Sequence, residues 1–270
     1  RVVIINAVSQ EHAEVTKYIV LPHVSSKTVG ITNGSDPELW KSDEILDAER
    51  SGQEVTGKLL FDAGVAARER LNEYLKINTG RGFSNTGRPL IGLVRRVVEY
   101  KEQCVLFPLL EWITGERGIV YELPWGEKRP GLGMNILVGG VGRDEIGKGW
   151  VEHFKWLARK DNLKGKFIFI DGTGTLLMRM ATQGSDVWVS MPRSSREACG
   201  TSDNRAAFNG HINIATKTGG PAEYIENGVN GWLMDIFGNS RYSFNDVVSL
   251  FQSSGPEKEG IVNFYRVAAQ

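Results

Sequence analysis

Residues 90–101 read LIGLVRRVVEYK, in which the apolar run Leu90–Val94 passes directly into two arginines. Further short apolar runs follow along the chain, separated by segments of helical period. These runs are Asn135–Val138, Lys166–Ile170, Asp186–Val189 and Ile212–Ala215. Near-continuous apolar runs of this length are typical of parallel strands buried on both faces of a sheet. The sequence therefore predicts an α/β fold with a Rossmann-like, doubly wound parallel sheet.

The remaining segments predict how the chain is organised. Helices are expected around Gln103–Thr114, Ile146–Lys160, Leu176–Gln183 and Asn204–Phe208. Residues 1–88 lack the alternation of apolar strands and helices, so we expect them to form a separate segment. We expect a sheet-forming lobe at 89–252. Turn residues at 253–256 precede a terminal helix, Glu257–Ala269, within 253–270. Because the chain opens on an apolar run without Met, we expect it to be a piece of a longer protein.

Composition excludes several classes of function. Lys plus Arg and Asp plus Glu both number 32, so no global field attracts nucleic acid or an anionic membrane. The apolar runs are far shorter than the roughly 20 residues of a membrane span. The two cysteines, Cys104 and Cys199, have no CxxC spacing, and the four histidines have no HExxH spacing, so we expect no metal site. We expect a cytoplasmic chain with neither nucleic acid nor membrane as a partner.

A pair of cations follows the first strand of the predicted sheet. Arg96 comes just after Leu90–Val94, and Lys101 lies five residues further on. Open α/β sheets bind ligands at the carboxyl ends of their strands, where a guanidinium and an ammonium can converge on one phosphate. A solvated basic loop is the alternative interpretation.

A glycine-rich stretch, GGVGRDEIGKG at residues 139–149, follows the second strand. Its G-x-x-x-x-G-K pattern raises the alternative of a P-loop nucleotide hydrolase, whose amides would cradle phosphates. Gly149 stands where such a loop needs a Ser or Thr hydroxyl for magnesium. We favour a sharp turn in which Gly139 and Gly140 allow close backbone packing.

The stretch PRSSREACGTSDNRAAFNG, residues 192–210, combines small residues with one carboxylate. Gly200, Thr201 and Ser202 lead into a short helix, so that several free amides point toward one place and favour an anion. Glu197 lies beside them and can accept hydrogen bonds from sugar hydroxyls. On local chemistry alone, a surface carboxylate and turn-forming glycines fit equally well.

The Arg96–Lys101 segment, RVVEYK, resembles the R-x-H-E-Y-K segment of the α-glucan phosphorylases, which are grouped with glycogen synthases among the retaining glycosyltransferases. The Glu197–Thr201 run, EACGT, follows in the order expected for this family. Other segments fit as well: Asn6–Val8 with His12, Thr32–Gly34 with Pro37 and Trp40, and Gly219–Gly220 with Glu223, Gly228 and Gly231–Trp232. The resemblance extends from about residue 6 to residue 235.

The resemblance implies a GT-B fold, in which two Rossmann-like lobes face each other across a cleft. Residues 89–252 would be the C-terminal, donor-binding lobe, and 1–88 a remnant of the N-terminal lobe. It implies that Arg96 and Lys101 bind the donor phosphate and that Glu197 and the Gly200 amide hold the sugar. The substrate-binding set it implies is Gly139, Gly140, Gly200, Thr201, Ser202 and Arg205.

Two positions depart from the phosphorylase pattern. Phosphorylases anchor pyridoxal phosphate through a lysine at the position of Arg205, and a guanidinium cannot form a Schiff base. Val3 stands where the family has a histidine near the sugar. We therefore expect no cofactor, and an arginine that can instead bind phosphate.

The resulting hypothesis is a retaining glucosyltransferase that moves glucose between a sugar nucleotide or glucose 1-phosphate and an α-glucan. The alternatives are a non-catalytic glucan-binding relative and the P-loop hydrolase. We expect a donor, an α-glucan acceptor and the missing N-terminal lobe as partners, and a homo-oligomer remains open. Without the missing lobe, we expect the isolated chain to be folded but inactive.

Overall fold

The computed structural model describes residues 4–194 and 196–234. At its centre is a six-stranded parallel sheet with the order β10-β9-β8-β3-β6-β7. The strands are β3 (Leu90–Val94), β6 (Asn135–Gly139), β7 (Phe167–Ile170), β8 (Val187–Ser190), β9 (Ile212–Thr216) and β10 (Gly231–Met234). The predicted α/β class with a parallel sheet is confirmed.

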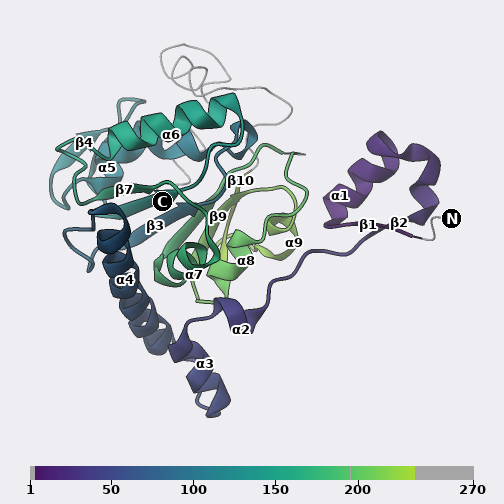
Figure 1. Ribbon diagram of the computed structural model, residues 1–270, viewed down its shortest axis with the longest axis horizontal. Helices are drawn as coiled ribbons and strands as arrows, with labels where there is room; N and C mark the ends of the chain where they lie inside the picture. Colours follow the sequence, from purple (N-terminus) through teal and green to yellow (C-terminus); the bar gives the residue numbers. More distant parts are fainter. Residues whose placement is uncertain (1–3, 195, 235–270) are drawn as a thin grey trace.

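Helices cover both faces of this sheet (Figure 1). Neighbouring residues of a strand point to opposite faces, and β3 divides its apolar side chains accordingly. Ile91 and Leu93 pack on the side of α5 (Leu110–Thr114) and α6 (Glu145–Leu157). Leu90 and Val94 pack on the side of α4 (Gly57–Thr79), α7 (Thr175–Gly184) and α8 (Ser202–Ala207).

The residues before the sheet form two groups. The strands β1 (Ile5–Ala7) and β2 (Thr28–Gly30) pair in parallel around α1 (Gln10–Val15) and the π-helical turn Thr16–Val20, apart from the main sheet (Figure 1). The helices α2 (Pro37–Trp40), α3 (Asp43–Arg50) and α4 follow. Leu71 and Leu75 of α4 share a core with Leu90 and Val94. A domain boundary at residue 88 stays a prediction, and side chains from both sides of that residue contribute to this core.

Some elements differ from the sequence-based expectation. The helix expected at Gln103–Thr114 is a 3₁₀ segment, Gln103–Leu109, followed by the short α5, because Pro108 lacks the amide that an α-helix requires there. The strand β10, the helix α9 (Pro221–Tyr224), the hairpin of β4 (Val120–Glu122) with β5 (Lys128–Pro130) and a 3₁₀ segment at Pro22–Lys27 were not anticipated. The predicted terminal helix Glu257–Ala269 lies outside the described residues.

Among the described residues, no helix combines the length and apolar character that crossing a bilayer requires.

Candidate active site

The chain reverses its direction of growth across the sheet between β3 and β8. From β3 it builds β6 and β7 on one side, and it then returns to build β8, β9 and β10 on the other. Such a switch point leaves a crevice at the carboxyl ends of the two central strands, where α/β proteins bind ligands. Arg95 directly follows β3 and Glu197 lies in the segment after β8, and their side chains meet at the carboxyl ends of these two strands.

Arg95 lies at the base of the crevice and is 6% exposed. Its Nη1 donates to Ser190 Oγ at 3.0 Å, and its Nη2 lies 3.5 Å from Glu197 Oε2. Its Nε is buried and has no hydrogen-bond partner within the described part of the chain. An unpaired buried donor is costly, and a ligand or water oxygen would relieve that cost.

Lys101 forms the closest contact in the crevice, an ion pair from its Nζ to Glu197 Oε2. Both side chains are almost entirely buried. Burial, together with the positive charge of Arg95, lowers the pKa of Lys101 from 10.5 to about 8, and the Glu197 carboxylate opposes part of that shift. The site therefore holds a buried ammonium and a buried carboxylate that are paired with each other. Either group can release the other and bind a ligand group instead.

Arg96 has a different environment from its neighbour Arg95. Its side chain is exposed, while its positive charge is near enough to contribute to the lowered pKa of Lys101. Of the residues singled out from the sequence, the structure brings Lys101 and Glu197 into contact and leaves Arg96 at the rim. Arg95 was not singled out, although the strand alternation that buries Val97 also buries Arg95.

Gly139 and Gly140 lie where the end of β6 passes beneath the arginine. A Cβ added at Gly140 would be 2.2 Å from the Arg95 carbonyl oxygen and 2.6 Å from Val97 Cγ2. Only glycine permits this approach, as expected from the sequence. Asp144 is the N-cap of the following α6, and its carboxylate accepts hydrogen bonds from Gly147 N at 2.6 Å and Glu99 N at 3.2 Å. The Gly147 amide, which a P-loop would use to bind a phosphate, is therefore already bound to the Asp144 carboxylate. This contact disfavours the P-loop hypothesis.

Gly200 lies between the side chains of Asp203, Arg95 and Glu197. A Cβ there would lie 3.2 Å from Asp203 Oδ1, 3.8 Å from Arg95 Nη2 and 3.9 Å from Glu197 Cγ. Asp203 is fully buried, its Oδ2 accepts a hydrogen bond from Tyr224, and burial raises its pKa. Sequence reasoning missed Asp203, because it reads as an ordinary first-turn residue of a short helix, α8.

Thr201 precedes α8 and makes no side-chain capping hydrogen bond, and Ser202 is buried as the first residue of that helix. Arg205, the basic residue in the last turn of α8, contacts the segment before α3. Its guanidinium stacks on the Trp40 ring at 3.9 Å from the ring centroid, and its Nε lies 3.3 Å from Ser35 Oγ. Arg205, for which the phosphorylase resemblance implies the position of the pyridoxal-phosphate lysine, thus packs against the Thr32–Trp40 segment.

The N-terminal β1–α1–β2 unit contacts the loops that border the crevice. Ser9 Oγ donates to the Ala198 carbonyl oxygen at 2.6 Å. Glu223 accepts hydrogen bonds from Gln10 N at 2.8 Å and from Thr32 Oγ1. Glu11 Oε2 in turn accepts from Gly219 N at 2.6 Å. This unit therefore lies against the Glu197-bearing loop.

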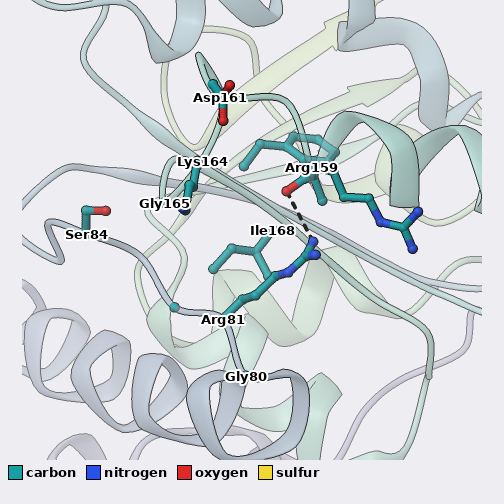
Figure 2. Close-up of a pocket in the computed structure, with 11 residues that line it drawn as sticks. Gly80, Arg81, Ser84, Arg159, Asp161, Lys164, Gly165 and Ile168 are labelled. Carbon is teal, nitrogen blue, oxygen red and sulfur yellow. Dashed lines mark hydrogen bonds between the residues drawn. The ribbon is translucent and has the colours of Figure 1, made fainter.

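A second cleft, of about 380 Å³, lies near the start of β7, at the opposite edge of the sheet (Figure 2). Arg81 Nη1 donates there to the Ala158 carbonyl oxygen at the end of α6, at 3.2 Å. The Arg159 guanidinium points away from Arg81 (Figure 2). Arg81 thus caps a helix carboxyl terminus, a position that favours a cation. Within the described residues, no group of three or more His, Cys, Asp or Glu could hold a metal ion.

The structure is a parallel, Rossmann-like α/β lobe with buried charges at its switch point, where open α/β sheets bind ligands. Comparison with known proteins narrows this class, although no family model matches. The chain is 27% identical over 267 residues to a maltodextrin phosphorylase of Thermococcus litoralis, covering 85% of this chain and 31% of that protein. It is 24% identical to a glycogen phosphorylase of Aquifex aeolicus, covering 84% of this chain and 37% of that protein.

A granule-bound starch synthase of Arabidopsis thaliana is also 24% identical, over 83% of this chain and 31% of that protein. The resemblance to the phosphorylase and glycogen synthase group is therefore confirmed, with homologues that cover most of the chain. The chain spans about a third of the length of these relatives.

Proposed function

We propose that this chain carries the donor-binding lobe of a retaining glucosyltransferase of the glucan phosphorylase and glycogen synthase type. The observation that carries the proposal is the buried Lys101–Glu197 pair above Arg95 at the switch point of the sheet. Burying two opposite charges costs more than a hydrophobic pair would, so such a pair is weak evidence of a stability role. A site that must bind a phosphate and a sugar hydroxyl together requires both charges.

In the proposed complex, the donor phosphate replaces Glu197 as the ion-pair partner of Lys101. Arg96 reaches the phosphate from the rim, and the amides at Gly200, Thr201 and Ser202, which lead into α8, face it from the other side. Glu197, still held by Arg95, then accepts hydrogen bonds from the sugar hydroxyls. Negative charge grows on the leaving phosphate oxygen as the glycosidic bond breaks, so fixed cations there stabilise the transition state more than the ground state.

The proposal includes no pyridoxal phosphate, because Arg205 cannot form the Schiff base and is packed on Trp40. The acceptor is proposed to be an α-glucan, the substrate that the names of the relatives point to. The donor is glucose 1-phosphate or a nucleotide-diphosphate glucose. Which of the two it is decides between phosphorolysis and synthesis.

The test is donor binding by calorimetry, because the chain spans only part of its relatives. We expect binding of glucose 1-phosphate, UDP-glucose or ADP-glucose, and a roughly ten- to hundredfold weaker affinity in Lys101→Met and in Arg96→Ala. Lys148→Ala, which removes an exposed lysine of α6, is the matched control and should bind as the parent does. The proposal fails if no donor binds, or if both site variants bind as tightly as the parent.

A further inference from the structure

Glu102 has the only positive φ among the non-glycine residues of the described chain. Its φ of 43° and ψ of 41° place it in the left-handed region, directly after Lys101, the last residue of the 3₁₀ turn Glu99–Lys101. A side chain in this region costs about 1–3 kcal/mol and persists only where its surroundings enforce it. The contacts that hold Glu102 in this conformation therefore indicate the function of the turn.

Arg193 supplies most of those contacts. Its Nε donates to Glu102 Oε1 at 2.6 Å, and its Nη1 lies 3.1 Å from Glu99 Oε1. Its backbone amide donates to the Tyr100 carbonyl oxygen at 2.8 Å. Arg193 thus contacts three residues of the four-residue turn that carries Lys101.

Arg193 also belongs to the loop that carries Glu197. It follows β8 and precedes Glu197 by four residues. Gln103, the residue after Glu102, adds a hydrogen bond from its Nε2 to the Arg95 carbonyl oxygen at 3.3 Å. These contacts fix the turn after β3 relative to the loop after β8.

We infer that Glu102 and Arg193 form a clamp that positions Lys101 against Glu197. The consequence for donor affinity rests on the function proposed above. Neither residue is placed in contact with the donor, so both are positioning residues. Sequence reasoning could not find the clamp, because 91 residues separate the two side chains.

The energetics favour positioning over simple stabilisation. Glu102 is 5% exposed, and burial raises its pKa to about 7 although Arg193 opposes the shift. Glu99 and Cys104, the other groups that face it, do not supply a positive charge. The pair therefore combines backbone strain with a carboxylate that is expensive to bury, and neither would be selected for stability alone.

The Glu102→Gly variant separates a role in positioning Lys101 from a role in stabilising the fold. Glycine adopts the left-handed conformation without strain, and this relief offsets the loss of the carboxylate's contact with Arg193, which keeps Glu99 as a partner, so the unfolding midpoint should change little while the clamp is removed. Glu102→Gln keeps the strain and removes the charge, and Arg193→Lys keeps the charge and removes the fork-shaped donor. Arg68→Lys is the matched control, because it weakens the ion pair of the buried Arg68 with the half-buried Asp186 at the amino end of β8, away from the candidate site.

The first measurement is the titration of Lys101 in the ligand-free chain, by competitive acetylation against pH with mass-spectrometric detection. The parent midpoint is expected near the lowered pKa of about 8. In all three clamp variants it should rise toward 10.5, because a released turn exposes the ammonium. In Arg68→Lys it should not move. An unchanged midpoint in the clamp variants would overturn the inference.

The second measurement is the affinity for glucose 1-phosphate and UDP-glucose. We expect an approximately tenfold loss in Glu102→Gly and Arg193→Lys, with Arg68→Lys unaffected. If the midpoint of Lys101 shifts but the parent binds neither compound, the clamp stands and the proposed function fails. If the parent binds and the clamp variants bind equally well, the inference is wrong.

Discussion

The close approach of Gly140 to Arg95 predicts that one substitution has opposite effects at two glycines. Gly140→Ala would place a methyl carbon 2.2 Å from the Arg95 carbonyl oxygen and 2.6 Å from Val97 Cγ2. Gly149→Ala, nine residues away in the exposed part of α6, would meet no atom within 4 Å. The two variants add the same atoms and differ only in their surroundings.

The magnitudes follow from these contacts. At Gly140 the obstacle is backbone, so the strand end must retreat by about 1 Å, at an overpacking cost of about 1–3 kcal/mol. The Arg95 amide donates to Gly139 O at 2.9 Å and its carbonyl accepts from Gln103, and weakening these bonds adds about 1 kcal/mol. At Gly149, alanine should instead stabilise the helix by about 0.5–1 kcal/mol.

Urea unfolding followed by circular dichroism measures both free energies of unfolding. Donor calorimetry then asks whether displacing Arg95 also weakens the site, as it should in Gly140→Ala and not in Gly149→Ala. Equal stability of Gly140→Ala and the parent would refute the packing argument. A destabilised Gly140→Ala with unchanged donor affinity would refute its connection to the site.

Three further outcomes are expected. Purified protein should show no Schiff-base absorbance and no borohydride-trapped pyridoxal adduct, because Arg205 replaces the lysine. Burial lowers the pKa of His211 to about 4, so below pH 6.5 the unfolded chain binds a proton that the folded chain does not. The free energy of unfolding, measured with urea, should therefore fall as the pH drops from 6.5 toward 4, and it should fall less in His211→Gln. Donor affinity should fall as the pH rises through about 8, where Lys101 loses its proton, and Lys101→Arg should remove that dependence in calorimetry.

Much of the sheet could be predicted because its strands are buried on both faces. The runs at β3 and β7 are continuously apolar, those at β6, β8 and β9 are mostly apolar with Asn213 interrupting β9, and the structure places strands at all of them. The edge strand β10 is buried only at its two ends, Gly231 and Met234, with Trp232 at 37% exposure, and four residues without a continuous apolar run give too little signal.

The candidate site could be predicted only where its residues follow a strand or form a local motif. Lys101 and Glu197 were found in this way, and the structure joins them across 96 residues of sequence. The choice between Arg95 and Arg96 depended on which way the strand end turns. Partners such as Arg193 for Glu102 depend on the tertiary fold and leave no pattern in the sequence.

The charge of the crevice explains how a neutral chain can select an anion. Arg95, Arg96 and Lys101 bring three positive charges to a site where Glu197 is the carboxylate in contact. Burial raises the pKa of the nearby Asp203, which favours its uncharged form and leaves the positive charge in excess. Because the whole chain has no net charge, this field is local and is screened within about 10 Å at moderate salt. Under the proposed function, selection of a phosphorylated sugar would therefore arise at this cluster, where Lys101 and the Glu197 carboxylate are already held in contact.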